Sequence, residues 1–510
     1  MRRRVIAAVL ATVLGAALVT ACTRDSSRPQ AEGAGGLIGG MTGPGPSSQA
    51  GPVALQSDRP RGGHAVVAAA GEQARYNYAP SLMRDGGAGR VRMWWCSQLV
   101  SAQPPGDDVL YAESGSVDGP FGAPNGTSGM AVFGGGGVGF DARHTCDPSV
   151  IRVGGTYYLY YTGAPSDHGA GNAIGLAVSA DGLTWARANG GAPIVTPANE
   201  VARANPYGAG QPSALFLDGW FYLLFTDTTG MGAGDNGAGQ FVLRSRDPAF
   251  ARDVETVSAG GFTPLPAGGA PPGGVSGRQR SVIDAFSADW MWVDALNAFA
   301  IGHETTGGTT ITFWDRDFRL NPYQPVLVAG PWQEGPGLVR DPLGHAPISA
   351  EDPCGRVPVD LVRATRDVRQ PTDLIHFGLD ARTVDGCATG ASAAATLRGF
   401  AVESPARTVD VVVGSAVVRV ERRSVAEAAG FRVIAGRPRG VDELPVAAHV
   451  APGARAITAP DRGTAFLLDG DRLWPVPSAG VAAANSSTVD DVSPSTWDSY
   501  ARAAEFTASR

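Results

Sequence analysis

Runs of apolar residues broken by short turns return four times in the middle of the chain. Each copy consists of a short apolar strand, a tight turn and a second strand rich in aromatic residues, which is typical of a β-hairpin. The four copies lie at residues 79–95, 147–161, 211–225 and 287–301. The pattern therefore predicts an antiparallel, all-β architecture for this part of the chain.

The spacing of the copies leaves room for more than one hairpin in each. Equivalent positions are 64 to 76 residues apart, whereas one hairpin takes about 20 residues. Residues 174–185 and 241–245 supply further strands in the second and third copies. Units of four antiparallel strands repeated radially are propeller blades, and a fifth unit is expected through residues 357–364 and 374–379. A β-sandwich with coincidental hairpins is the alternative.

Residues 1–22 have the features of a targeting segment. Three arginines precede an apolar stretch that is too short for a comfortable membrane span. The segment ends in Leu18-Val19-Thr20-Ala21-Cys22, which resembles the bacterial lipoprotein box, whose cysteine is lipidated and becomes the mature N-terminus. An ordinary secretion signal is the alternative. We expect an extracytoplasmic protein anchored in the membrane by lipid on Cys22.

Two further regions flank the predicted propeller, which we assign to residues 64–400. Residues 23–63 are rich in Gly, Pro, Ser and Gln and are expected to form a flexible tether. Residues 401–510 are expected to form a small α+β module. Its segment 463–478 resembles small β modules attached to bacterial envelope proteins, which suggests docking to a wall polymer or to the propeller rather than catalysis.

Composition narrows the functional classes. Charged residues make up 17% of the 510 positions and the net charge is −7, so the chain lacks the basic surface of a nucleic-acid-binding protein. The 70 glycines and 38 prolines suit a turn-rich β protein. No C-x-x-C or His-rich spacing suggests a metal site, and we expect a monomer.

The second repeat carries a resemblance to a known family. Residues 147–161 read Asp-Pro-Ser-Val-Ile-Arg-Val-Gly-Gly-Thr-Tyr-Tyr-Leu-Tyr-Tyr, which resembles the first-blade signature of five-bladed propeller glycosidases, with glycoside hydrolase family 43 and its relatives nearest. The turn at residues 179–185 is similar to the S-x-D-G-x-T-W turn of the same propellers. The resemblance covers about residues 75–400. It implies a five-bladed propeller that hydrolyses glycosidic bonds, and it makes an axial Ca²⁺ possible, with no other cofactor expected.

A glycosidase needs two carboxyl groups, one protonated and one ionised, on either side of the bond to be broken. The resemblance places the general base at Asp147, the first residue of the second repeat. Asp289, in the fourth repeat, is expected to face the same way and to act as the residue that tunes the pKa of the others. The family's own position for that aspartate holds Ser213 here, and Asp284 is a substitute for Asp289.

The general acid is expected to be Glu304, after the second strand of the fourth repeat. In an antiparallel hairpin, the end of the second strand lies beside the start of the first, so Glu304 should share one end of the propeller with Asp147. Glu334 is a rival, because an acidic glutamate before Gly-Pro occurs in the family. Tyr78, His303 and Gln211 are expected to contact the substrate.

Four cysteines remain after Cys22, and in an exported protein they suggest two disulfides with three possible connectivities. Cys96 ends the second strand of the first repeat, and Cys146 precedes the first strand of the second. Adjacent blades would bring these ends together, so we expect Cys96–Cys146, and Cys354–Cys387 follows by elimination.

The sequence therefore predicts a lipid-anchored glycosidase that inverts a glycosidic bond in a cell-envelope or environmental polysaccharide, with arabinose or xylose as the first guess. Two other classes stay open. A non-catalytic carbohydrate-binding propeller would have an aromatic cleft without paired carboxylates, and an envelope scaffold would have a flat apolar axial face. Because propellers host many functions, the fold does not distinguish these three classes. A cluster of carboxylates around the propeller axis would distinguish the glycosidase from the other two.

Overall fold

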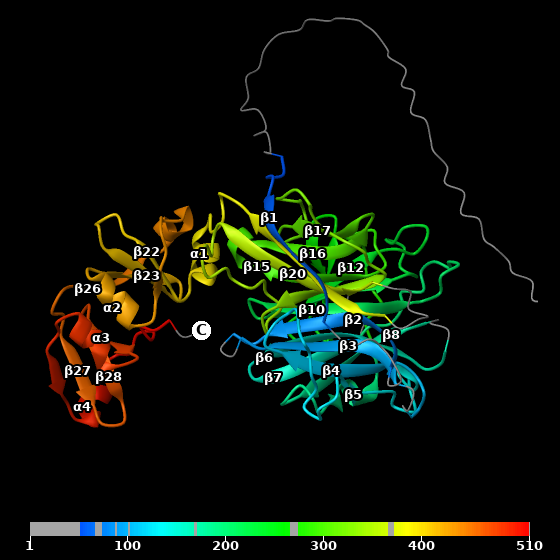
Figure 1. The fold of residues 1–510 in the computed structure, drawn as a ribbon, viewed down its shortest axis with the longest axis horizontal. Helices are drawn as coiled ribbons and strands as arrows, with labels where there is room; N and C mark the ends of the chain where they lie inside the picture. Colours follow the sequence, from blue (N-terminus) through cyan, green and yellow to red (C-terminus); the bar gives the residue numbers. More distant parts are fainter. Residues whose placement is uncertain are drawn as a thin grey trace, which may run out of the picture. The chain divides into compact units, whose positions relative to one another are not determined.

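The computed structural model describes residues 51–66, 74–86, 89–99, 103–167, 171–265, 274–365 and 372–508 (Figure 1). The predicted targeting segment, Cys22 and most of the predicted tether lie outside these ranges. Within the described ranges, no helix is long and apolar enough to cross a membrane. The described chain is mostly β, as expected.

Five antiparallel units follow one another along the chain, and together they form what we call the five-unit ring. The first unit contains β2 (Ala74–Arg84), β3 (Val91–Leu99), β4 (Asp108–Ser114) and β5 (Met130–Phe133). The second contains β6 (His144–Val153), β7 (Thr156–Ala164), β8 (Ala173–Ser179) and β9 (Ala186–Arg187). The third contains β10 (Ala209–Leu217), β11 (Trp220–Asp227), β12 (Gln240–Ser245), β13 (Glu255–Ser258) and β14 (Gly261–Pro264).

The fourth and fifth units complete the ring. The fourth contains β15 (Ala288–Val293), β16 (Ala298–Thr305), β17 (Gly308–Trp314) and β18 (Val326–Ala329). The fifth contains β19 (Glu334–Arg340), β20 (Arg356–Ala364), β21 (Leu374–Arg382) and β1 (Gln56–Ala65). The four predicted hairpins are confirmed as β2–β3, β6–β7, β10–β11 and β15–β16.

The first strands of the units meet around a common centre. Each of β2, β6, β10 and β15 contacts the first strand of the next unit, and β19 pairs in parallel with β2. Near the start of four of these strands, the pairing register slips across a residue and the proline that follows it. The residues at the slip have positive φ: Ala79 (44°), Asp147 (47°), Gln211 (50°) and Gly335 (54°). This conformation is costly for a residue with a side chain, so the surrounding strands must impose it.

Two expectations about the ends of the propeller were wrong. The predicted tether extended to residue 63, but residues 56–65 form strand β1, which pairs with β21 as the outer strand of the fifth unit. The fifth unit was expected only as residues 357–364 and 374–379, which correspond to β20 and β21. Its first strand, β19, was missed, and it begins at Glu334.

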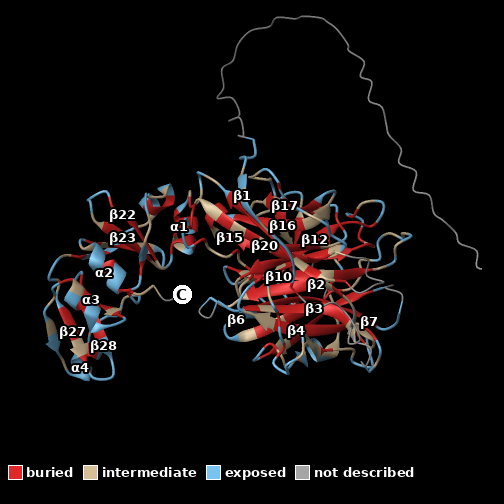
Figure 2. Cartoon of the chain, viewed as in Figure 1, coloured by how far each residue is buried: buried red, intermediate tan, exposed pale blue. Residues whose placement is uncertain are grey.

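Large aromatic residues fill the spaces between strands. Trp94, Trp95, Trp290 and Trp292 are all buried, and the rings of Trp290 and Phe299 stack with centroids 5.0 Å apart. Figure 2 shows buried residues along the strands and exposed residues in the loops. These tryptophans therefore pack the core and are not available to stack on a sugar.

Residues 400–498 contain a tandem duplication that the sequence analysis did not find. The first copy contains β22 (Phe400–Glu403), β23 (Val409–Val413), β24 (Ala416–Val420), α2 (Arg423–Ala428) and β25 (Arg432–Val433). The second contains β27 (Ala456–Ala459), β28 (Gly463–Leu468), β29 (Arg472–Val476), α3 (Ala479–Ala484) and β30 (Val489–Asp491), followed by α4 (Pro494–Asp498). In both copies, three antiparallel strands precede a helix, and the last strand pairs in parallel with the first.

The duplication also appears in the side chains. Buried residues recur at a constant offset of 56 positions, so that Val425 corresponds to Val481 and Ala426 to Ala482, all of them fully buried in the two helices. Strand β26 (Val446–Val450) pairs with β24 of the first copy. We call residues 400–498 the tandem module; it is the predicted α+β module, built from two similar halves.

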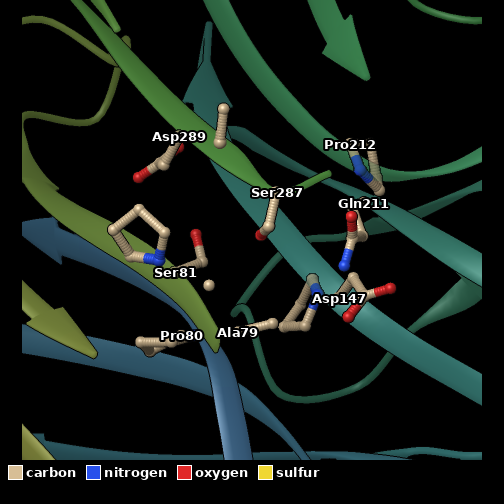
Figure 3. Close-up of a pocket in the computed structure, with 12 residues that line it drawn as sticks. Ala79, Pro80, Ser81, Asp147, Gln211, Pro212, Ser287 and Asp289 are labelled. Atoms are coloured by element: carbon tan, nitrogen blue, oxygen red, sulfur yellow. The ribbon is translucent and has the colours of Figure 1, made fainter. Parts of the chain in front are cut away.

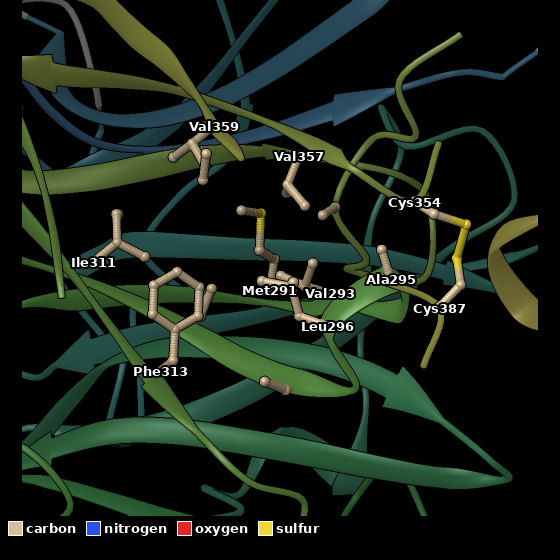
Figure 4. Packing of buried hydrophobic residues seen from close by; sticks show 14 of the residues in the cluster. Met291, Val293, Ala295, Leu296, Ile311, Phe313, Cys354, Val357, Val359 and Cys387 are labelled. Atoms are coloured by element: carbon tan, nitrogen blue, oxygen red, sulfur yellow. A yellow bond between two sulfur atoms is a disulfide. The ribbon is translucent and has the colours of Figure 1, made fainter. Parts of the chain in front are cut away.

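Both expected disulfides are present. Cys96 is bonded to Cys146, and Cys354 to Cys387. The first joins the first two units of the ring. The second lies at the edge of a hydrophobic cluster that includes Met291, Val293 and Phe313 (Figure 4).

Candidate active site

Two adjoining hollows lie where the first strands of the five units begin. The smaller, of about 30 Å³, is lined by the starts of all five first strands, including Ala79, Asp147, Gln211, Ser287 and Gly335 (Figure 3). The larger is a cavity of about 230 Å³. Asp147 and Gln211 line both. The strained residues described above therefore converge on a single site.

The cavity brings together three carboxylic acids and a set of neutral polar groups. Its lining residues are Tyr78, Asp107, His144, Cys146, Asp147, Thr162, Ala164, Ser166, Asn172, Tyr207, Gln211 and Glu334. They contain no lysine or arginine. Hydroxyl and amide groups of this kind exchange hydrogen bonds with sugar hydroxyls, so the lining suits a neutral, polar ligand.

Asp147 is held in the wall of the cavity by its backbone and its neighbours. It sits at the register slip of β6, and its side chain is buried. Its Oδ2 accepts a hydrogen bond of 3.2 Å from the hydroxyl of Tyr207. Burial raises the pKa of Asp147 to about 6, while hydrogen bonds from Thr162 and Tyr207 act in the opposite direction. Asp147 is therefore ionised above about pH 6.

Glu334, the first residue of β19, lines the same cavity as Asp147. Its Oε1 accepts a hydrogen bond of 3.1 Å from Nε2 of Gln211. Burial, followed by the negative charge of Asp147, raises the pKa of Glu334 to about 7. Because the charge of Asp147 raises the pKa of Glu334, the pair keeps one proton after it has lost the first. Such a pair supplies an acid and a base at the same pH.

Tyr78 and Gln211, both expected to contact the substrate, line the cavity. The hydroxyl of Tyr78 lies 2.9 Å from Sγ of Cys146, and Gln211 bridges Glu334 and the hydroxyl of Thr226. Asn172 was not expected here; it is buried and its Oδ1 has no hydrogen-bond partner. A buried acceptor without a donor is costly, and a ligand hydroxyl would satisfy it.

Asp289 lines only the small hollow, and its carboxylate is fully engaged. Its Oδ2 accepts a hydrogen bond of 2.6 Å from the backbone N–H of Leu338, and its Oδ1 accepts one from the hydroxyl of Ser213. Oδ1 also lies 3.2 Å from the guanidinium of Arg340. In Figure 3, Asp289 and Asp147 lie on opposite sides of the hollow. Asp289 is thus the counter-ion of a buried arginine.

Arg340 occupies the centre of the ring beneath the small hollow. Its Nη1 donates to Ser213 Oγ (3.1 Å) and to the carbonyls of Ala214 and Trp290 (both 3.0 Å). Its Nη2 lies 3.4 Å from Ser149 Oγ and 3.5 Å from Ser81 Oγ. The side chain is 1% exposed.

Arg340 uses the groups that would bind the axial Ca²⁺ that the family resemblance made possible. A guanidinium already lies among the serine hydroxyls and the carboxylate that a calcium ion would use as ligands. Two cations cannot share these groups without strong repulsion. The residues around Arg340 therefore do not fit a calcium ion.

Glu304 and His303 lie apart from the cavity. Thr309 donates a hydrogen bond of 3.0 Å to Oε2 of Glu304, and burial raises the pKa of Glu304 to about 7, partly offset by the charge of Arg363. His303 lies 3.2 Å from the hydroxyl of Thr312. Neither residue lines either hollow. The expectation that Glu304 shares a pocket with Asp147 was therefore wrong.

The contacts of Glu304 lie at the β16–β17 turn. Glu304 pairs with Thr309 there and accepts the hydrogen bond from its hydroxyl, and the same hydroxyl accepts a hydrogen bond from Arg363 of the fifth unit. Asp284, the substitute for Asp289, is exposed in a loop and also lies outside the two hollows.

The cavity also contains residues that the sequence analysis missed. Asp107 directly precedes β4, His144 begins β6, and Tyr207 lies just before β10. All three belong to loops or strand ends, where no periodic pattern marks them. Glu334 did carry a signal, because its Glu-Gly-Pro sequence repeats the proline found near the start of three of the other four first strands.

Comparison with known proteins gives structural similarity only. No protein-family model matches the chain, and no curated protein matches it. Among solved structures, the family 117 glycoside hydrolase Zg3597 of the marine bacterium Zobellia galactanivorans is 13% identical, with a TM-score of 0.41, over 65% of this chain and 91% of its own.

Two other solved structures give similar values. The GH43_1 enzyme from Xanthomonas citri complexed with xylose is 14% identical, with a TM-score of 0.38, over 69% of this chain and 94% of its own. A protein of the GH130 family of mannoside phosphorylases, which contains glycoside hydrolases that target β-1,2 mannosidic linkages in Candida mannan, is 10% identical, with a TM-score of 0.36, over 65% and 95%. We therefore base the function on the residues of the cavity.

Proposed function

We propose that this protein is a glycoside hydrolase built on a five-bladed β-propeller, with Asp147 as the general base and Glu334 as the general acid. The observation that carries the proposal is the pair of carboxylic acids in one polar cavity, with pKa values of about 6 and about 7. Neither a binding module nor a scaffold needs such a pair.

The proposed reaction follows from the two protonation states. Asp147, ionised, accepts a proton from a water molecule as that water attacks the anomeric carbon. Glu334, protonated, gives its proton to the leaving glycosidic oxygen as the bond breaks. The anomeric configuration is inverted, because water enters from the face opposite the leaving group. The cavity of about 230 Å³ is large beside the roughly 30 Å³ of one water in the liquid.

The neighbours of the pair take part in binding and orientation. Gln211 donates to Glu334 and so fixes the direction of the acid. Tyr207 donates to Asp147 and favours its ionised form. Tyr78 and Asn172 offer a hydroxyl and a free carbonyl oxygen to the sugar. We propose arabinose- and xylose-containing polysaccharides as the first substrates to test.

The test compares three variants of the purified full chain. We expect Asp147→Asn and Glu334→Gln to lose most of the release of sugar from arabinan or xylan, whose leaving groups need protonation, with proton NMR showing the inverted anomer from the unaltered protein. Glu304→Gln is the matched control, because Glu304 is a buried carboxyl with a similar pKa outside the cavity. Full activity in Glu334→Gln would overturn the assignment, and saccharide binding without any turnover would favour a carbohydrate-binding propeller.

We also propose that the protein is an extracytoplasmic lipoprotein anchored through Cys22, as the residues before it suggest. The two disulfides support an oxidising compartment. Metabolic labelling with an alkyne fatty acid should tag the native chain and not Cys22→Ser. Equal labelling of both would contradict the anchor.

A further inference from the structure

A third carboxylate, Asp107, shares the cavity with the proposed acid and base and has no part in the mechanism above. It lies directly before β4, and its side chain is 15% exposed. Its Oδ2 is 3.0 Å from Nδ1 of His144, and the hydroxyl of Tyr76 donates to its Oδ1. These contacts from β2 and β6 hold the carboxylate in one orientation at the cavity wall.

Asp107 and Asp147 both lie near one sulfur atom. A carboxylate oxygen of Asp107 is within 4.8 Å of Sγ of Cys146, and Oδ1 of Asp147 is 3.5 Å from the same sulfur. Cys146 and Cys96 are joined in a disulfide, so the sulfurs do not act as metal ligands here. The half-cystine is uncharged and does not shield one carboxylate from the other.

The charged and titratable groups around Asp107 come from several elements. His144 of β6 contacts it directly, and the other ring nitrogen of His144 lies 3.0 Å from Asp167. Arg143 pairs with the same Asp167 at 2.9 Å, which leaves His144 as the main counter-charge of Asp107. The remaining titratable groups are Tyr76 and Tyr78 of β2, Asp108 of β4, Tyr207, Asp147 and Glu334.

Asp107 and Asp289 differ in the part of the site that each of them lines. Asp289 lies 3.2 Å from Arg340 and lines only the small hollow. Asp107 also has a counter-ion, His144 at 3.0 Å, but it lines the cavity that contains Asp147 and Glu334. We propose that Asp107, oriented by His144 and Tyr76, is the positioning carboxylate that controls the ionisation of the Asp147–Glu334 pair, and that Asp289 instead holds Arg340 in the ring centre. This inference rests on the proposed function.

The electrostatics agree with the geometry. A fixed negative charge opposes the ionisation of its neighbours. The charge of Asp107 raises the pKa of Asp147 and of Glu334, in each case after burial, whereas Asp289 contributes to neither. Asp107 thereby helps Glu334 to keep its proton at the pH where Asp147 has lost its own.

The test uses variants whose effects have opposite signs. Asp107→Asn keeps the shape and removes the charge, so the pKa of Glu334 should fall by roughly 1 unit. His144→Gln removes the counter-charge and leaves Asp107 ionised, so the same pKa should rise. Asp107→Glu restores the charge and should restore the value, and Glu304→Gln, which changes a carboxyl group outside the cavity, should leave it unchanged.

Two readouts separate this inference from the proposed function. Titration of the full chain with ¹³C-labelled carboxyl groups, followed by NMR, reports the pKa of Glu334 whether or not the protein hydrolyses a glycoside. In the pH–rate profile, the descending limb should move with the same sign, and kcat should change more than KM. An unmoved pKa of Glu334 in both Asp107→Asn and His144→Gln, or an equal shift in Glu304→Gln, overturns the role of Asp107. If the pKa of Glu334 shifts as expected but the protein hydrolyses no glycoside, the hydrolase proposal fails. The effect of Asp107 on the pKa of Glu334 is then still supported.

Discussion

The five-unit ring and the tandem module are both built from repeats, but they use equivalent positions in opposite ways. In the ring, one position near the start of the first strand holds Ala79, Asp147, Gln211, Ser287 or Gly335, and all five line one hollow. In the tandem module, equivalent positions hold similar apolar residues and are buried in the core. Closure of the ring brings one position of every copy to a common centre, where different side chains can combine into a site. Two tandem copies have no such centre, so equivalent positions there serve packing.

The largest expected effect comes from the ring's centre. Asp147→Asn and Glu334→Gln should each lower kcat by about 10²–10⁴-fold, the usual contribution of a general acid or base. Steady-state hydrolysis of an oligosaccharide, whose leaving group needs protonation, measures this loss. Substitutions of buried apolar residues in the tandem module should leave kcat within about twofold of the native value. A loss of kcat there as large as the loss in the ring would contradict the difference between the two regions.

Removal of the central arginine should have the largest effect on stability. Arg340→Met leaves Asp289 buried without its counter-ion, which typically costs about 3–5 kcal/mol. Chemical denaturation of the full chain should show this loss as a lower free energy of unfolding of the ring. The double variant Arg340→Met with Asp289→Asn should recover part of it, whereas additive losses would show that the two residues do not act as a pair.

The duplicated helices of the tandem module should respond alike. Val425→Ala and Val481→Ala each remove two methyl groups from a fully buried position, and each should cost about 1–3 kcal/mol. Because the positions are equivalent in the two copies, the two losses should agree within about 1 kcal/mol. A loss confined to one of them, measured by thermal unfolding, would contradict the structural equivalence.

The pH dependence should reflect the pair in the ring. Activity should rise as Asp147 loses its proton near pH 6 and fall as Glu334 loses its proton near pH 7, giving a narrow bell-shaped profile. The two limbs belong to the coupled pair. Glu304→Gln should keep both limbs, although Glu304 also has a pKa of about 7; loss of the descending limb in that variant would return the acid role to Glu304.

The smallest effect should come from chelation. Because the guanidinium of Arg340 occupies the ring centre, treatment with EDTA should change neither the melting temperature nor kcat by a measurable amount. Differential scanning fluorimetry with EDTA and with added Ca²⁺ measures this directly. A calcium-dependent increase in melting temperature would contradict the assignment of Arg340 as the central cation.

The hairpins could be predicted because each is a local pattern of apolar residues and turns. The Cys96–Cys146 bond could be predicted because the repeat order places both cysteines at neighbouring strand ends. The fifth first strand escaped because Gly335-Pro336-Gly337 offers little apolar signal. The tandem duplication escaped because its copies share apolar character at a constant offset with only scattered identities, such as Val425 with Val481, so short segments of the two look unrelated.

The sequence alone determined the β architecture, the repeat spacing, the disulfide pairing and the position of Asp147, since all of these depend on neighbours along the chain or on the repeat order. Only the tertiary structure decided which carboxylates meet. Glu334, Asp107 and Asp147 come from three different units and share one cavity, whereas Glu304 is bound to Thr309 and Asp289 to Arg340. The direction of a side chain at a strand end depends on register slips and on packing between units. These are long-range properties that a local sequence pattern does not contain.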